Sequence, residues 1–223
     1  MASEREERNR RRLVESARFL FFSEGFSGLG MERIAERLGV SKATLYKYAP
    51  DKRALVAAVV DLQMEEIGAR LEGLGTPGRS FADRFETLLR TIFETIGPSM
   101  RRFVPDILRD APWEWERIAE FRRKRVFSLL GDLLDQGARQ GMIRSDMAAG
   151  TLAPILVSVV EQFGRPEVLA GLPVSMEQTI RAFAGILLQG ILSEGGRREF
   201  ERIGSNMQRT PRPIRDAEGG ESV

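Results

Sequence analysis

Apolar residues recur at the helical interval of about 3.6 positions along most of this chain, and no stretch alternates with the period of two expected of a half-buried strand. In the first such stretch, at about 8–24, Leu13, Ala17 and Phe21 fall on one face. Similar apolar stripes continue to a last one at 175–194. Because helices and strands require different periods, the sequence predicts an all-α protein.

Glycine, proline and capping side chains divide this pattern into separate helices. Gly25 and Gly39 stand where helix ends favour a left-handed residue, and Ser41 and Asp51 stand where the following helices need an N-cap. The expected helices cover residues 8–24, 31–38, 42–48, 52–71, 80–96, 99–109, 112–140, 146–163 and 175–194. We assign residues 1–51 to a first domain and 52–195 to a second. Residues 196–223, rich in Gly, Arg, Glu and Pro, are expected to form a disordered tail.

The 223 residues include no cysteine and no histidine. Their absence excludes disulfides, thiolate nucleophiles and the Ser-His-Asp triad, and it removes the commonest ligands of transition metals. We therefore expect no catalytic residues, no metal site and no cofactor, and we interpret the protein as a non-enzyme. A helical enzyme that uses carboxylates or lysines remains the alternative.

The N-terminus is charged and lacks the apolar segment of a signal peptide. The longest apolar runs, around 152–160 and 186–192, fall short of the roughly 20 residues that a membrane span needs. We expect a cytoplasmic protein without a membrane partner.

Charge is distributed unevenly. Residues 1–53 hold 12 Lys and Arg against 8 Asp and Glu, whereas residues 54–195 hold 16 against 19. A basic front section beside a mildly acidic body favours a polyanionic partner, and ordinary surface charge is the alternative. The arginine-rich arm at 5–12 could reach phosphates or a minor groove, or it could be a solvated terminus.

The two short helices expected at 31–38 and 42–48 have the spacing of a helix-turn-helix. Ala35 is the small inward residue that lets two helices meet at a steep angle, and Gly39 tolerates the positive φ of a tight turn. Leu45 points into the junction. A second helix of this size fits the major groove of B-form DNA.

We predict that this second helix, together with the start of the next, contacts DNA. Thr44 can reach a base edge, and Lys47 can neutralise a phosphate. The predicted DNA-binding residues are Lys42, Ala43, Thr44, Tyr46, Lys47, Tyr48 and Lys52. The alternative is an interior helical hairpin, but packing alone does not need two tyrosines, a threonine and two lysines on the outer side.

Residues 13–60 resemble the N-terminal domain of the TetR family of one-component bacterial regulators. The resemblance lies in the stretches SEGF (23–26), IAERLGVSK (34–42) and TLYKY (44–48), and in Asp51, Lys52 and Leu55. It implies a DNA-binding helix-turn-helix domain whose contacts include Ala43, Thr44, Tyr46, Tyr48 and Lys52. It also implies an all-helical C-terminal domain that binds a ligand and forms a homodimer.

Two positions depart from the family pattern. Ala49 stands where the family usually has an aromatic residue, and an unfilled space there would cost about 3–5 kcal/mol. The aromatic run at 19–22 is a candidate to refill that space. Gly30 stands where the family usually has Thr or Ser, which removes a hydroxyl that could touch a phosphate.

The C-terminal half matches the family by the number and order of its expected helices. A pocket for an apolar or aromatic molecule would be lined by Phe85, Phe93, Phe103, Trp113, Phe121, Phe127 and Phe163. The last two helices would form the dimer through Ile155, Val159, Phe183, Ala184, Leu187, Leu188 and Ile191. For both sets, the alternative is that the residues belong to an ordinary core.

The resulting hypothesis is a homodimeric transcriptional regulator that binds a palindromic operator in double-stranded DNA, a repressor released by a small apolar ligand. One alternative is an activator, or a regulator controlled by a protein partner instead of a small ligand. The helical enzyme is the other.

Overall fold

The computed structural model describes residues 2–75, 78–91, 94, 99, 102–146, 149–163 and 176–207. Within these ranges the regular structure is helical, and the only ladder pairing is one isolated antiparallel bridge between Ile143 and Leu192. The predicted all-α fold is therefore confirmed. In the same ranges, none of the helices combines the length and the apolar character that crossing a bilayer requires.

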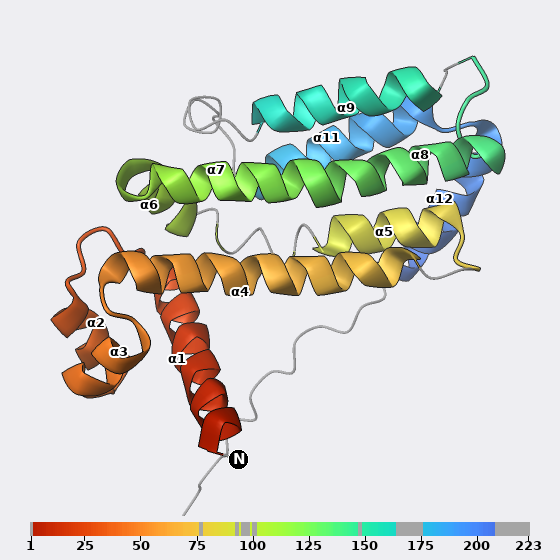
Figure 1. Cartoon of the computed structure of the whole chain (residues 1–223). Coiled ribbons are helices and arrows are strands. Elements are labelled where there is room, and N and C mark those ends of the chain that lie inside the picture. The colour runs from red at the N-terminus through yellow and green to blue at the C-terminus, as the bar shows by residue number, and fades with distance from the viewer. Residues whose placement is uncertain are drawn as a thin grey trace, which may run out of the picture.

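The helices form two groups along the chain. The N-terminal group consists of α1 (Ala2–Glu24), α2 (Met31–Arg37), α3 (Lys42–Tyr48) and α4 (Lys52–Glu72). The second consists of α5 (Phe81–Thr91), α6 (Phe103–Asp110), α7 (Pro112–Phe121), α8 (Ser128–Arg139), α9 (Ala149–Phe163), α11 (Met176–Ile191) and α12 (Glu194–Met207). A 3-10 turn, Gly73–Gly75, follows α4, and a π-helical segment, Arg122–Phe127, joins α7 to α8. Figure 1 shows α2 and α3 beside one end of α4, with the second group stacked over α4.

Local chemistry explains the boundaries in the N-terminal group. Gly25 and Gly39 have φ values of +84° and +66°, in the left-handed region that other residues rarely adopt. The side chain of Asp51 accepts the Ala54 N–H over 2.7 Å and so caps the start of α4. Because each signal acts within a few residues, the observed bounds of α2, α3 and α4 lie within about one residue of those expected.

The first hydrophobic core joins α1 to α4 and also takes in α6. Its buried residues are Leu13, Val14, Ala17, Leu20, Phe21, Phe26, Ile34, Ala35, Leu45, Ala49, Leu55, Val56, Val59, Val60, Leu62, Phe103, Ile107 and Ala111. Since α4 contributes residues as far as Leu62, the boundary expected after residue 51 would cut through this core. Helix α4 is thus part of both halves of the fold.

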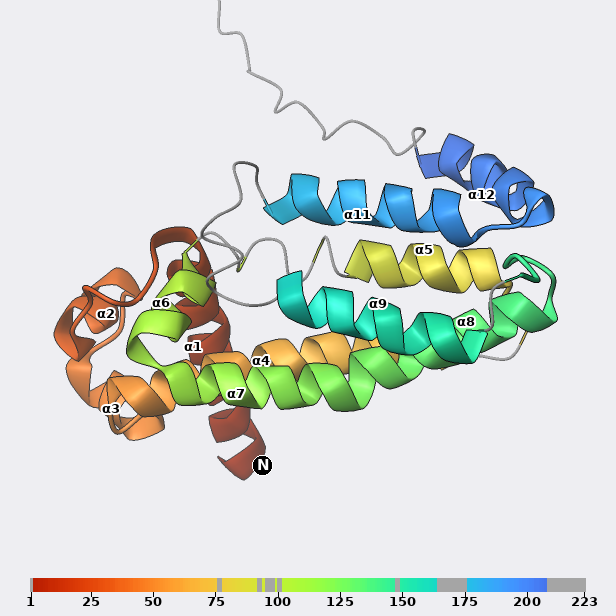
Figure 2. The same ribbon diagram turned by 90° about the horizontal axis from the view of Figure 1, so that it is seen from above.

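The second core lies between the far half of α4 and the helices above it. It is built from Ile67, Leu71, Leu74, Phe81, Phe85, Leu88, Leu130, Leu133, Leu134, Ile143, Leu152, Leu156, Ile191 and Leu192. Helix α8 packs on α9 and α5, and α12 packs on α5. Seen from above, α9, α5 and α11 run along the body in roughly parallel lines (Figure 2).

Several expected segments differ from the structure, and α1 begins at Ala2 instead of at about residue 8. Helix α6 begins at Phe103 and not at 99, and the segment expected at 112–140 contains a π-helical stretch between two α-helices. Helix α12 occupies the start of the expected tail because Phe200 packs edge-on against Phe81 and Phe85, with 5.8 Å between ring centroids in each pair. The rest of that tail, 208–223, lies outside the described residues.

Candidate nucleic-acid interface

Helices α2 and α3 meet through a small buried junction. Ile34, Ala35 and Leu45 are each at most 1% exposed. The Val40 N–H donates to the Ala35 carbonyl over 3.0 Å, and Gly39 supplies the positive φ of the turn. The junction therefore has the apolar contacts and the tight turn of the predicted helix-turn-helix.

The first turn of α3 is held by its cap. The Ser41 hydroxyl accepts the Thr44 N–H over 3.0 Å, and the Ser41 and Thr44 hydroxyl oxygens lie 2.8 Å apart. A helix of seven residues is too short to be stable alone, so this cap and the buried Leu45 hold it in place. The half-buried Thr44 hydroxyl keeps further hydrogen-bonding capacity for an outside partner.

The outer side of α3 is open to solvent. Lys42, Ala43, Tyr46 and Lys47 are exposed, and Tyr46 keeps 47% of its surface accessible. Tyr48 is half-buried because it packs against the first core. Helix α3 thus presents a row of polar and small side chains around the single buried anchor Leu45.

Both lysines of α3 have carboxylate partners. Lys42 Nζ lies 2.6 Å from Glu32 Oε1 on α2, and Lys47 Nζ lies 2.9 Å from Glu6 Oε1 on α1. Hydrogen bonding to Lys42 lowers the pKa of Glu32, and hydrogen bonding to Glu6 raises the pKa of Lys47. These pairs are exposed, so water and salt screen them and phosphates can replace the carboxylates.

Lys52 is placed differently from the lysines of α3. Its Nζ donates to the Ser27 carbonyl over 3.0 Å and lies 5.5 Å from the ring centroid of Phe26. The half-buried side chain therefore joins α4 to the α1–α2 loop. An ammonium group has three N–H donors, so Lys52 can still donate to a phosphate.

Ala49 and Gly30, the two positions that depart from the family pattern, are both helix caps in the structure. Ala49 is 2% exposed and caps α3, with its N–H donating to the Leu45 carbonyl over 2.9 Å. From the aromatic run at 19–22, Phe21 is buried in the same core as Ala49, whereas Phe19 is 78% exposed and cannot refill the space. Gly30 caps α2 without a side-chain hydrogen bond.

The arginine-rich arm is the first part of α1. Arg10 pairs with Glu7 over 3.4 Å, and Arg11 pairs with Glu15 over 3.2 Å, each within one or two turns of the helix. The arm is therefore a continuous part of helix α1.

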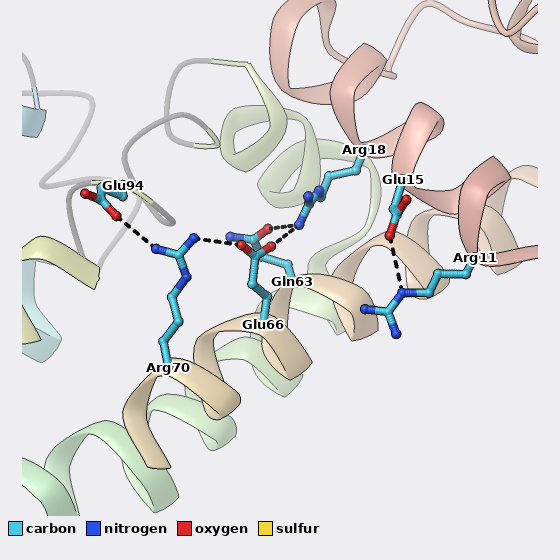
Figure 3. A network of polar contacts seen from close by, with 7 residues as sticks. All are labelled: Arg11, Glu15, Arg18, Gln63, Glu66, Arg70 and Glu94. Carbon is cyan, nitrogen blue, oxygen red and sulfur yellow. Dashed lines mark hydrogen bonds and ion pairs between the residues drawn. The ribbon is translucent and has the colours of Figure 1, made fainter. Parts of the chain in front are cut away.

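A polar network fixes α1 against the middle of α4 (Figure 3). Arg18 pairs with Glu66 and also donates to Gln63 over 3.4 Å. Arg70 lies 3.0 Å from both Glu66 and Glu94. The hydrogen bond from Arg18 is the main cause of a lowered pKa at Glu66, and Arg70 adds to it.

The predicted pocket residues are divided between the two hydrophobic cores, and their role as the lining of a pocket stays a prediction. Phe103 and Trp113 pack in the first core, whereas Phe85 and Phe121 pack in the second. Phe127 is also buried. Two further members, Phe93 and the side chain of Phe163, lie outside the described residues. Apolar spacing identified these rings as buried without identifying their partners.

The predicted dimer residues are also divided. Ala184 and Ile191 are at most 7% exposed within one chain, and their place in an intermolecular surface stays a prediction. Phe183, Leu187 and Leu188 are half-buried because they pack against the second core. Val159 is half-buried as well. Among the side chains described on these two helices, the large apolar ones that are exposed are Ile155 on α9 and Ile186 on α11, at 53% and 73%.

Sequence reasoning did not single out the carboxylates that organise this end of the molecule. Glu6, Glu32, Glu66 and Asp106 each contact a group on another element. These partners lie from 10 to 80 positions away along the chain, and no local spacing identifies them.

Comparisons with known proteins agree with this geometry. Residues 13–59 match the family model described as bacterial regulatory proteins, tetR family. The HTH-type transcriptional repressor KstR of Rhodococcus jostii (strain RHA1) is 29% identical over 92 residues, which cover 41% of this chain and 42% of that protein. An HTH-type transcriptional regulator of Staphylococcus aureus (strain USA300) is 39% identical over 57 residues, which cover 26% of this chain and 31% of the relative. The chain thus matches less than half the length of these curated relatives.

The fold of the whole chain also has solved neighbours. The ketosteroid transcriptional regulator KstR2 of Mycobacterium tuberculosis matches with a TM-score of 0.56 and 20% identity, over 83% of this chain and 95% of that one. At this identity the likeness concerns the fold. Together, the helix-turn-helix geometry and the match over residues 13–59 assign this N-terminal segment to the tetR family model of bacterial regulatory proteins, and the fold of the chain is like that of this solved regulator.

Proposed function

We propose that this protein is a dimeric transcriptional repressor that binds a palindromic operator through α3 and releases it when a small apolar molecule binds in the C-terminal half. The observation that carries the proposal is the outer side of α3. It exposes Lys42, Ala43, Tyr46 and Lys47 while Leu45 anchors the helix from below.

The chemistry of this surface suits duplex DNA. Ala43 and Thr44 lie in the first turn of α3, the part of a reading helix that approaches base edges. Lys42, Lys47 and Tyr46 surround them and can bind phosphate oxygens, which position the helix in the groove. Tyr48 at the end of α3 and Lys52 at the start of α4 lie at one end of this surface, where we assign them to contacts with DNA phosphates. Residues 1–51, together with Lys52 at the start of α4, supply the reading surface, and the rest of α4 connects it to the ligand-binding and dimerisation part.

A dimer is needed because one short helix reads only a few base pairs. Two copies of α3 must lie about 34–36 Å apart to enter successive major grooves. Helices α9 and α11 form the layer of the body farthest from α4 (Figure 1), and the exposed Ile155 and Ile186 support a dimer surface there. A ligand can change the separation of the two α3 helices only if it binds one arrangement of the dimer more tightly than another.

The operator claim is tested by selecting duplexes from a random pool with the purified full-length chain at physiological salt. We expect an enriched palindrome whose half-site centres are separated by about one helical turn, and a dimeric mass in sedimentation. A chain that binds the enriched pool no better than random duplex would refute the proposal.

Release is tested by adding small molecules to the protein–operator complex. A panel of apolar compounds should include a ketosteroid, because one structural neighbour is a ketosteroid transcriptional regulator. A compound of the predicted kind lowers operator affinity and, in an in vitro transcription assay, raises transcript from an operator-bearing promoter. Transcript that falls when the operator is freed would identify an activator and contradict the repressor assignment.

A further inference from the structure

A buried carboxylate on α6 holds the loop that joins α1 to α2. Asp106 is 9% exposed. Its Oδ2 accepts the backbone N–H groups of Phe26 and Ser27 over 2.5 and 2.9 Å, although these residues are about 80 positions away in the sequence. Charged acceptors form stronger hydrogen bonds than neutral ones, and a buried N–H left without a partner is costly. The contact therefore constrains both segments.

The loop is shaped around this carboxylate. Gly25 has φ +84°, and the N–H groups that follow such a residue converge on one point and form an anion-binding concavity. A Cβ atom on Gly25 would lie 2.5 Å from Asp106 Oδ2, a distance that real Cβ atoms do not tolerate. Position 25 thus needs glycine both for its φ angle and for the close approach of the carboxylate.

Neighbouring contacts reinforce the attachment from two sides. Phe103, one turn before Asp106 on α6, places its ring 5.2 Å from that of Phe22 and 5.7 Å from that of Phe26, measured between centroids. From α4, Lys52 donates to the carbonyl of Ser27, the residue whose N–H donates to Asp106. The α1–α2 loop is therefore bound to two helices at once.

We propose that Asp106 is a positioning residue that fixes the angle at which the body carries α3, and that it thereby sets the operator spacing that the dimer accepts. Without Asp106, α4 and the apolar contacts would still hold the N-terminal unit, but the unit could rock about the start of α4. The hydrogen bonds from Phe26 and Ser27 to Asp106 attach the unit at a point away from the α4 axis and so oppose this rocking. The inference rests on the proposed function, in which two copies of α3 read one duplex.

The test compares operators with different spacers. Each inserted base pair moves one half-site by about 3.4 Å and turns it by about a tenth of a helical turn. We expect the wild-type dimer to prefer the selected spacing over one lengthened by two base pairs by about tenfold or more. In D106S, which removes the acceptor and leaves room for water, this preference should fall to about threefold or less, with the same consensus within each half-site.

A matched control keeps the loop contact intact. Arg109 lies 2.8 Å from the other oxygen of the same carboxylate, and its side chain is 63% exposed. R109S removes this partner while the two backbone N–H groups keep theirs, so its spacing preference should equal that of the wild type. The loss of spacing preference in D106S is a readout that general destabilisation does not produce, provided that both variants show the wild-type circular dichroism at the assay temperature.

The outcomes separate this inference from the proposed function. A wild-type protein without any preferred duplex would overturn both. A wild-type protein with a preferred palindrome, together with a folded D106S of unchanged spacing preference, would overturn the role of Asp106 alone. If D106S does not fold, D106N retains one acceptor oxygen and should give an intermediate preference. Hydrogen exchange in the wild-type protein should also show slow amides at Phe26 and Ser27, and fast exchange there would overturn the inference.

Discussion

Two glycines of α8 should respond in opposite ways to the same substitution. A Cβ atom on Gly137 would lie 2.9 Å from Phe81 Cε2 and 3.0 Å from Ile143 Cδ1, whereas a Cβ atom on Gly131 would meet nothing within 4 Å. Gly131 lies in the interior of α8 and Gly137 in its last turn, and replacing a helical glycine with alanine stabilises by up to about 1 kcal/mol if space allows.

The neighbours of Gly137 have little freedom to move. Phe81 is fully buried, with its ring held between those of Phe85 and Phe200, and Ile143 is 3% exposed. Forcing a methyl group into such a site costs about 1–3 kcal/mol. We therefore expect G137A to lower the free energy of unfolding by up to about 2 kcal/mol, and G131A to raise it by about 0.5–1 kcal/mol.

Urea denaturation followed by circular dichroism measures both values, with equal m-values as the check that unfolding is comparable. A G137A variant at least as stable as G131A would refute this reasoning, because the packing of α8 against α5 would then be looser than described. The pair is informative since helix propensity favours alanine in both variants, so only the packing around position 137 gives the two changes opposite signs.

The remaining predictions concern the N-terminal half. L45A should lower the free energy of unfolding by about 2–5 kcal/mol in urea denaturation and abolish operator binding, because Leu45 is the buried anchor of α3. E66Q should destabilise by no more than about 1 kcal/mol at pH 7, since Glu66 is partly exposed to solvent. Because Arg18 lowers the pKa of Glu66 in the folded state, this difference should be present above the unfolded pKa and vanish as the pH falls through the folded one. E6Q should tighten operator binding by about two- to fivefold in a fluorescence titration, because it frees Lys47 from its carboxylate partner.

Each of these predictions has a control in a neighbouring residue. Y46A alters an exposed side chain next to Leu45 and should leave the free energy of unfolding within about 0.5 kcal/mol of the wild type. E65Q changes an exposed glutamate beside Glu66, so a pH-dependent loss as large as that of E66Q would argue against the Arg18 pair. An unchanged operator affinity in E6Q, at low salt, would mean that Glu6 does not compete with phosphate.

The parts of the fold that the sequence predicted depend on local chemistry. The bounds of α3 follow from the Ser41 cap and from Pro50 beyond its end, and the turn before it follows from Gly39. The exposed residues of α3 could be predicted because the helix is short and has one buried residue, Leu45. Burying Leu45 fixes how the helix is turned about its own axis. These signals act over a few residues, where backbone geometry leaves few choices.

The parts that could not be predicted depend on contacts between distant segments. Phe103 has the spacing of a core residue, but nothing in its neighbourhood indicates that it packs against α1 and not against α5. An apolar residue such as Ile191 suits a dimer interface as well as the core of one chain. Only the packing of α11 shows that Ile191 is buried within one chain. Likewise, one aromatic residue, Phe200, orders a polar segment that composition alone would assign to a tail.

The central claim is that α3 reads the bases of an operator, and a change of Thr44 tests it most directly. T44V removes the hydroxyl and keeps the size of the side chain, so duplex selection with the wild type and with T44V should yield palindromes that differ at the same base pair in both half-sites. An identical consensus from a T44V protein that still binds tightly would contradict the placement of α3 at the bases.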